Sequence, residues 1–446
     1  MFQICEISGS DTIPPAAANR ESNVSAIAIV HAMSSSSTSP PKTTRYKEKR
    51  EAILAAAARQ FNERGVKDAT LSEIAASVGL VTSGITYYYR KKEDLAAACL
   101  LRAIAEDKKL ALEAARETGV TQRVTRLFML HAERLAAIDS GEQPPLIGFS
   151  DIRALPDAQA ATVFTAYNDL FRCVRALLAS PEAAALSRDA RNARAHLLIS
   201  STMTVSFWIS RCEIDEYPSV ARRIADIVLH GVIKSATAWP GDAALDSLRL
   251  PEPPPAPDET AEAFLQAATE LVNEQGYRGA SVDRIAALLN ATKGKFYHYN
   301  ETKIDLITAC FERSFALQRH FLKAAALPGG AGSLRVCAAA MALVRFQLSP
   351  RGPLLRNAAY SALPDQQHRQ QVYRTMQRVI ERMVGLLVDG LVDGSVRPQD
   401  PAIAAQVLDT AINAAAELRR WVPGISEDNI TRLYTRPSLL GLLCDE

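Results

Sequence analysis

Aromatic residues, paired cysteines and long uncharged stretches are all scarce in this 446-residue chain. The seven cysteines are scattered without a CxxC pair, so we expect neither a disulfide framework nor a cysteine zinc centre. The longest uncharged stretch lies between Arg194 and Arg211 and is shorter than the ~20 residues of a membrane span. The net charge is only +2, so any surface for nucleic acid must come from local clustering of basic residues.

Signatures of catalysis are also missing. The chain has no HExxH, GxSxG, phosphate-binding loop or dinucleotide fingerprint. Nothing in the sequence fixes the mutual distance of His131, His196 and His230, so no metal site is expected. We therefore expect no cofactor and no enzymatic activity. An enzyme whose acids and bases come from unrelated helices remains one alternative.

The N-terminal 41 residues show no helical or strand period, and Ser34–Ser39 is followed by two prolines. This composition predicts a disordered segment at 1–41. The apolar stretch Ala26–Val30 is short and no basic region precedes it, so no signal peptide is expected and the location should be cytoplasmic, on the nucleoid. Met33 is an alternative start, which mass spectrometry of the native N-terminus would test.

The stretch that organises the chain is Thr70–Lys92, which predicts two short helices joined by a tight turn. Thr70 and Glu73 form a capping box, and Gly79 stands where the chain must turn left-handed to leave the helix. A second short helix begins near Thr82. The first of the two helices has one apolar face, made by Leu71, Ile74, Ala75 and Val78.

The same pattern returns at Ser281–Lys303 without a gap. Ile285 matches Ile74, and Asn290 replaces Gly79 with the next best residue for a left-handed cap. The helix before each copy ends at a glycine, Gly65 or Gly276. One polypeptide therefore carries two copies of one module.

Both copies resemble the N-terminal DNA-binding domain of TetR-family transcriptional regulators, over about 50 residues each. The first copy departs from the family pattern at Ser83, where glycine is frequent, and at Thr86, where an aromatic is usual. The resemblance implies a helix-turn-helix, a variable helical effector domain and, usually, a homodimer. The second copy fits the family signature closely, at Thr292, Lys293, Gly294, Phe296, Tyr297, His298, Tyr299, Lys303 and Leu306.

No stretch alternates with period two, so the expected fold class is all-α: two tandem modules, each a three-helix DNA-binding domain followed by a helical effector and dimerisation domain. The proline-rich segment 240–258 is read as a stiff linker without core residues. The predicted domains are 42–95 and 96–239 before that linker, and 259–306 and 307–446 after it. Helices are expected at Lys92–Ala115, Thr121–Ile138, Asp157–Leu178, Pro181–Ile209, Tyr217–Ala238, Ile304–Ala326, Ser333–Leu348, Pro364–Val392, Pro401–Val422 and Asp428–Leu443.

Contacts to DNA are expected from both copies. Short hydroxyl side chains at the start of the first recognition helix can face bases, and the second copy offers lysines for guanine or phosphate. Tyr89 is expected in the core, with Tyr87 or Tyr88 outward. The basic arm before the first helix is read as a phosphate or minor-groove contact, with a solvated helix start as the alternative. The predicted DNA-binding residues are Arg45, Lys47, Thr70, Thr82, Ser83, Thr86, Tyr87, Tyr88 and Lys92, and then Ser281, Thr292, Lys293, Lys295, Tyr297, His298, Tyr299 and Lys303.

The sequence thus predicts a transcriptional regulator of double-stranded operator DNA, more a repressor than an activator, released by a small-molecule effector. No membrane partner is expected. The two modules either pair inside one chain as a pseudo-dimer, through the last helices that dimerise in the family, or two chains form a homodimer with four motifs. A vestigial second DNA site and a helical interaction scaffold with relic motifs remain alternatives. Candidate effector contacts, each also readable as core, are His131, Tyr167, His196, Phe207 and Trp208.

Overall fold

In the part of the chain that it describes, the computed structural model contains helices and no strands, apart from one isolated antiparallel bridge between Ile233 and Val396. The described residues are 44–149, 152, 155–234, 239, 249–292, 294, 302–326, 329–363 and 366–445. The all-α prediction is confirmed. The segment 1–41, including Met33, lies outside the described residues.

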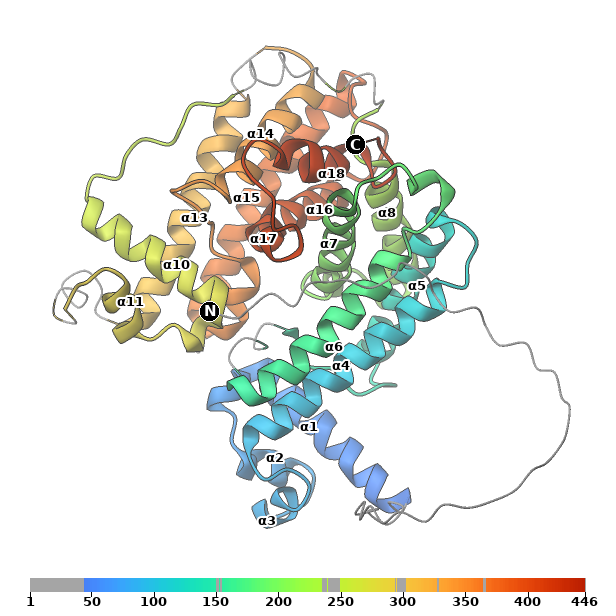
Figure 1. Cartoon of the computed structure of the whole chain (residues 1–446), viewed down its shortest axis with the longest axis vertical. Helices are drawn as coiled ribbons and strands as arrows, with labels where there is room; N and C mark the ends of the chain where they lie inside the picture. The colour runs from blue at the N-terminus through green and yellow to red at the C-terminus, as the bar shows by residue number, and fades with distance from the viewer. Residues whose placement is uncertain are drawn as a thin grey trace, which may run out of the picture.

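The helices fall into two successive modules (Figure 1). The first contains α1 (Thr44–Asp68), α2 (Leu71–Ser77), α3 (Thr82–Thr86), α4 (Lys92–Ala114), α5 (Val120–Asp139), α6 (Asp157–Ala176), α7 (Arg188–Val205) and α8 (Tyr217–His230). The second contains α10 (Glu259–Gly279), α11 (Val282–Leu288), α13 (Lys303–Ala326), α14 (Gly332–Phe346), the 3-10 helix η6 (Asn357–Ala362), α15 (Gln366–Val392), α16 (Pro401–Ala414), α17 (Leu418–Trp421), the π-helical turn η8 (Thr431–Thr435) and α18 (Arg436–Leu440).

Several helix ends differ from the predicted ones, because local capping overrides the apolar pattern. Helix α7 begins at Arg188, since the Ser187 hydroxyl accepts a hydrogen bond from the backbone N–H of Ala190. Helix α8 ends at His230, since Gly231 adopts a left-handed φ of 67°. Helices α4 and α13 run through the predicted domain boundaries at 95/96 and 306/307, so each DNA-binding domain is joined to its helical domain by a continuous helix.

The last helices of the two modules pack against each other. Helix α7 of the first module contacts α16 of the second. In addition, α16 contacts α8, at the end of the first module, and α7 contacts η8, near the end of the second. In Figure 1 these helices form the centre of the molecule, with α1–α3 at the bottom and α10–α11 at the left. The arrangement is that of a four-helix bundle built within one chain.

Buried polar contacts fix this bundle. Arg194 has none of its surface exposed and donates to the carbonyl oxygens of Leu442 and Cys444, both at 2.8 Å. The Asn192 amide donates to the carbonyl oxygen of Trp421 at 2.9 Å, and the Trp421 ring stacks on Phe171 with centroids 3.7 Å apart. Since buried donors need acceptors, these residues set one relative position of the modules.

The ends of α8 and α18 cross at two glycines, Gly231 and Gly441. The N–H of Val232 donates to Leu439 O at 2.8 Å, and the N–H of Leu442 donates to Val228 O at 3.1 Å. The two contacts correspond when the modules are exchanged, although the acceptor lies two residues before Gly441 in one and three residues before Gly231 in the other. The crossing therefore has the local pseudo-two-fold symmetry that a homodimer would show between two chains.

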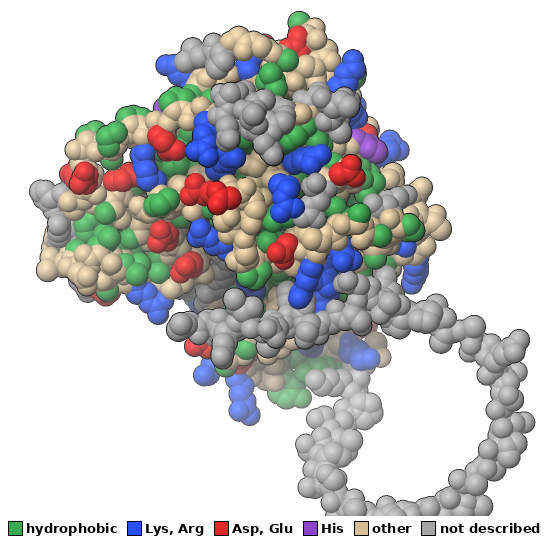
Figure 2. All heavy atoms as spheres, turned by 45° about the horizontal axis from the view of Figure 1, so that its top comes forward, with side chains coloured by type: hydrophobic (Ala, Val, Ile, Leu, Met, Phe, Trp, Pro, Cys, Tyr) green, Lys and Arg blue, Asp and Glu red, His purple; other side chains and the backbone are tan. Residues whose placement is uncertain are grey.

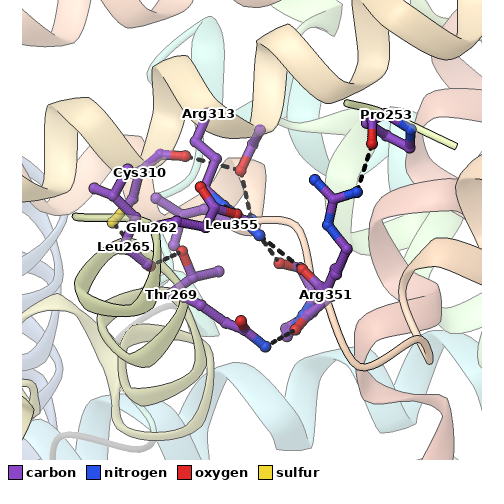
Figure 3. A network of polar contacts seen from close by, with 12 residues as sticks. Pro253, Glu262, Leu265, Thr269, Cys310, Arg313, Arg351 and Leu355 are labelled. Carbon is purple, nitrogen blue, oxygen red and sulfur yellow. Dashed lines mark hydrogen bonds and ion pairs between the residues drawn. The ribbon is translucent and has the colours of Figure 1, made fainter. Parts of the chain in front are cut away.

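The linker is docked on the second module at its described end. The Arg351 guanidinium donates to the carbonyl oxygens of Pro253 at 2.6 Å and Pro254 at 3.1 Å, as Figure 3 shows for Pro253. Arg313, which is 8% exposed, pairs with Glu262 at 2.7 Å and donates to the Arg351 carbonyl oxygen. The expectation of a linker without core contacts is wrong for Pro253, which is buried because Arg351 satisfies its carbonyl.

The face of the molecule in Figure 2 carries charges of both signs. On the face in Figure 2, which brings the top of Figure 1 forward, Lys and Arg side chains are interspersed with Asp and Glu and do not gather into one patch. None of the helices in the described ranges is long and apolar enough to cross a membrane. The described residues also hold no group of three His, Cys, Asp or Glu side chains that could bind a metal ion.

Candidate nucleic-acid interface

The first helix-turn-helix is built by local hydrogen bonds that its sequence specifies. The Thr70 hydroxyl accepts from the Glu73 N–H at 3.2 Å, and the Glu73 carboxylate accepts in return from the Thr70 N–H, also at 3.2 Å. The hydrogen bonds from the Thr70 side chain and backbone hold the pKa of Glu73 below its usual value. Gly79 has φ 66°, and the next N–H, of Leu80, closes the turn on Ala75 O at 2.9 Å. The predicted capping box and left-handed turn are confirmed.

This turn presents one face of α3 to solvent. Ile85 is completely buried and anchors the helix, while Thr82, Ser83 and Thr86 are exposed, as a base-reading surface requires. The Thr86 hydroxyl donates to Ser83 O at 3.0 Å, which leaves its methyl group and oxygen lone pairs for a ligand.

The three consecutive tyrosines point in different directions, as predicted. Tyr89 is 8% exposed, and its burial raises the pKa of its phenol to about 12. Tyr87 is 76% exposed, and Tyr88 is half-buried. Tyr87 and Tyr88 therefore remain available at the end of α3, while Tyr89 holds that end on the core.

The basic arm of the first module is helical, because α1 begins at Thr44. Arg45 and Lys47 are exposed in its first turn, which contains no acidic residue. Cations at a helix N-terminus oppose the helix dipole, at a cost of about 0.3–1 kcal/mol each, and a nearby phosphate would relieve that cost. Between them, Tyr46 lies 4.8 Å from Tyr88 and 6.4 Å from Tyr87 by ring centroids, so the arm is docked on the recognition helix.

Removing the contact of the Tyr46 ring with Tyr87 and Tyr88 should weaken DNA binding. We expect Tyr46→Ala to lose on the order of tenfold in affinity, since aromatic pairs contribute about 0.5–1.5 kcal/mol beyond burial and 1.4 kcal/mol is tenfold. Fluorescence anisotropy with a labelled operator at fixed salt measures it. Tyr46→Phe keeps the rings in place and should bind like the wild type. Equal losses in both variants would mean that the hydroxyl matters and the packing does not.

The second copy has the same scaffold up to its turn. The Ser281 hydroxyl accepts from the Arg284 N–H at 3.3 Å, and Asn290 has φ 48°, the one non-glycine residue with positive φ in the described part of the chain. The N–H of Ala291 donates to Ala286 O at 2.9 Å, as Leu80 does to Ala75. Thr292 is exposed just after the turn. The predicted contacts Lys293, Lys295, Tyr297, His298 and Tyr299 lie outside the described residues.

Two predicted phosphate contacts also have a structural role. The Lys92 ammonium donates to Ala69 O at 2.8 Å, and the Lys303 ammonium donates to Tyr277 O and lies 4.3 Å from the centre of the Tyr277 ring. Each lysine thus ties the helix after the motif to the end of the helix before it. A change at either lysine would disturb this packing as well as any phosphate contact, and their role toward phosphate stays a prediction.

Of the five candidate effector contacts, Tyr167 and His196 lie beside the same ring, that of Trp421. His131 is buried on α5 beside Arg134, whose guanidinium pairs with Asp107. Burial lowers the pKa of His131 well below its usual value. Trp208 is buried after α7. The other three face the second module: Tyr167 and His196 lie near Trp421, with ring centroids 5.9 and 6.4 Å away, and Phe207 lies edge-on to Tyr360. Their effector role stays a prediction.

Sequence reasoning missed Tyr46 and the side-chain-to-backbone hydrogen bonds of Asn192 and Arg194 across the modules. The sequence offered a signal for Tyr46, because an aromatic ring among basic residues is expected to pack against a neighbouring element. The interface residues had none, since their partners are more than 200 positions away in the chain.

Comparison with known proteins agrees with this geometry. Residues 53–99 and 264–310 each match the family model described as bacterial regulatory proteins, tetR family. The HTH-type transcriptional repressor BepR of Brucella suis biovar 1 is 41% identical over 69 residues, which are 16% of this chain and 33% of BepR. The HTH-type transcriptional dual regulator CecR of Shigella flexneri is 43% identical over 60 residues, 14% of this chain and 26% of CecR. The chain thus spans about a third or less of the length of these curated relatives.

Among solved structures, a TetR-family transcriptional regulator from Bordetella parapertussis 12822 is 18% identical with a TM-score of 0.35, over 41% of this chain and 94% of that one. AibR in complex with isovaleryl coenzyme A and operator DNA is 18% identical with a TM-score of 0.34, over 41% of this chain and 98% of AibR. The two matches show that this chain carries two tandem DNA-binding domains of the TetR type, at residues 53–99 and 264–310.

Proposed function

We propose that this protein is a ligand-responsive transcriptional regulator, more specifically a repressor that an effector releases from operator DNA. The observation that carries the proposal is the exposed face of α3. An exposed basic arm lies next to it, held there by the contact between the Tyr46 and Tyr88 rings. Hydroxyl side chains on α3 suit direct contacts to bases, and the arm suits phosphates.

The salt dependence of DNA binding tests this function against its rivals. We expect the affinity for genomic fragments to fall steeply between low and moderate salt, because phosphate contacts release counterions. Binding that is weak and flat with salt would favour the alternatives, a helical interaction scaffold or an enzyme with relic motifs. Sequencing of the bound fragments would give the operator and the neighbouring genes.

We also propose that the two modules of one chain pair with each other in the way that the two subunits of a TetR-family homodimer do. The bundle of α7, α8, α16 and the C-terminal segment supports it, since the surface that would join two chains is already occupied within one. A pseudo-two-fold then holds two unlike recognition helices, because the hydroxyls of Thr82, Ser83 and Thr86 bond to bases of either type, whereas lysines favour guanine. The operator should be an imperfect palindrome, with half-sites about 34–36 Å apart.

Light scattering on the purified DNA complex tests this assembly. We expect one 48.4 kDa chain per operator with two different half-sites. Two chains on a perfectly symmetric site would instead support a homodimer with four motifs. If scrambling the half-site of the second module leaves the affinity unchanged, that module is vestigial for DNA.

Release by an effector requires that the effector bind the DNA-free state more tightly than the DNA-bound state. In this chain both DNA-binding domains are joined to helical domains by single long helices, α4 and α13. A shift within either helical domain can therefore change the separation of the two recognition helices.

A further inference from the structure

A small cavity lies in the second helical domain, where α13, α14, α15 and α16 meet. Its volume is about 10 Å³, which is roughly the room that one water molecule needs. Six apolar side chains form most of its wall: Leu322, Leu343, Val379, Ile380, Met383 and Ile412. The remaining two lining residues, Gln318 and Asp409, are polar.

Neither polar residue is fully satisfied by the protein. Asp409 accepts one hydrogen bond, to Oδ2 from the Asn357 amide at 2.8 Å, and makes no ion pair with any residue in the described ranges. Gln318 is 3% exposed, and its amide makes no hydrogen bond to any described residue. Burial raises the pKa of the Asp409 carboxyl to about 7.

A carboxylate with a single hydrogen bond to the described residues, and an amide with none, carry a desolvation cost in a mostly apolar site. Such groups in native proteins call for a ligand or a function. A carboxylate accepts hydrogen bonds and attracts positive charge, the amide oxygen of Gln318 accepts one more, and the surrounding walls are aliphatic. A ligand with a positively charged group on an apolar body would suit the carboxylate, the amide oxygen and the aliphatic walls together.

We propose that this cavity is the binding site of a small hydrophobic cation, whose charged group is received by Asp409 and Gln318 and whose apolar body separates α15 from α13 and α16. As it stands the cavity is too small for such a molecule, so binding must move at least one of these helices. Met383 lies on α15 at the cavity and has the flexible side chain that adapts most readily to a new shape.

The site is connected to both DNA-binding domains through η6. Asn357, which holds Asp409, is the first residue of η6, and η6 packs against α1, α10 and α15. The preceding residue also belongs to this connection, since the Arg356 N–H donates to the Asn273 side chain on α10 at 3.0 Å. A cation that draws Asp409 from Asn357 would thus displace a segment that touches the first helix of both modules. This regulatory part rests on the proposed function.

The test uses n-hexylamine as the probe, with n-hexanol and hexanoate as neutral and anionic controls of the same chain length. At about pH 8 the amine, like a lysine side chain, is protonated. We expect hexylamine to raise the Tm of the full-length protein in a saturable way, with no effect of hexanoate and at least tenfold weaker binding of hexanol. Asp409→Asn should weaken hexylamine binding at least tenfold, and Gln318→Met should weaken it less.

Glu381→Gln is the matched control, because it removes one exposed carboxylate from α15 beside the cavity residues and should bind hexylamine like the wild type. Equal binding of hexanol and hexylamine, or unchanged binding by both Asp409→Asn and Gln318→Met, would overturn the site. So would the absence of saturable binding to the wild type, which would leave the cavity as the place of a buried water.

Operator binding provides a separate readout. Hexylamine should change the operator affinity of the wild type at least fivefold, and Asn357→Ala should still bind hexylamine while its operator affinity responds less than twofold. Binding of hexylamine without any change in wild-type operator affinity would overturn the connection through η6. Failure of the proposed function looks different: the protein would then not bind DNA even without hexylamine, while the Tm experiment still tests the site.

Discussion

Gly231→Ala should lower the free energy of unfolding by at least about 3 kcal/mol, and Gly441→Ala should do the same. A Cβ at Gly231 would lie 2.2 Å from Leu439 O, and a Cβ at Gly441 would lie 2.1 Å from Leu229 O. Both glycines also have positive φ, 67° and 97°, which L-residues rarely adopt. Because the clashing atoms are backbone, no side chain can move aside, and the crossing of the two modules must open.

Urea unfolding measures the effect, and Gly141→Ala is the matched control. Gly141 has φ 80° but no atom within 4 Å of an added Cβ, so only the conformational strain remains, about 1–2 kcal/mol. If Gly231→Ala and Gly141→Ala cost the same, the ends of α8 and α18 do not cross in solution. In that case the pairing of modules within one chain must be abandoned.

Asp409→Asn should become more stable relative to the wild type as the pH rises. Burial raises the folded-state pKa of Asp409 to about 7, while the unfolded carboxyl titrates near ~3.9. Proton binding therefore favours the folded wild type, and that stability is complete below about pH 4 and is lost as the pH rises through about 7. Asparagine does not titrate, so the stability difference should shift in favour of the variant by about 2 kcal/mol between about pH 5.5 and pH 8.5.

Unfolding in urea at a series of pH values, followed by circular dichroism, checks this prediction. Glu381→Gln removes an exposed carboxylate from the same domain and should track the wild type within about 0.5 kcal/mol at every pH. A constant difference between Asp409→Asn and the wild type would show that the Asp409 carboxyl titrates at its ordinary pKa. The cavity would then be well solvated, and the desolvation argument for a cationic ligand would lose its force.

Much of the DNA-binding domain could be predicted from the sequence, because local interactions build it. The capping box of Thr70 and Glu73 involves residues three positions apart, and Gly79 and Asn290 satisfy a backbone requirement at their own positions. Helical spacing predicted that the tyrosines would point in different directions; in the structure α3 ends at Thr86, and it is the turn after it that leaves Tyr87 exposed and Tyr89 buried. The repeat itself needed no structure, because it is visible as a gapless alignment.

The candidate effector contacts could not be found in this way. His196 and Tyr167 lie on apolar faces, which predicts burial but not the partner that buries them, and that partner is Trp421 of the other module. Asp409 stands on a mostly apolar helix, yet only the packing of four helices shows that its carboxylate lines a cavity. Likewise Lys92 reads as a free basic residue until the carbonyl of Ala69 is placed beside it.

By itself, the sequence determined that the chain is helical, that it carries two helix-turn-helix modules and where each turn lies, because capping, glycine conformation and apolar periodicity act between residues a few positions apart. Only the tertiary structure decided that the modules pair within one chain, that the prolines of the linker are docked, and that Asp409 and Gln318 share a cavity. These features depend on contacts between residues far apart in the chain, such as Arg194 with Leu442 and Gly231 with Leu439, and no local pattern encodes which distant surface a helix face will meet.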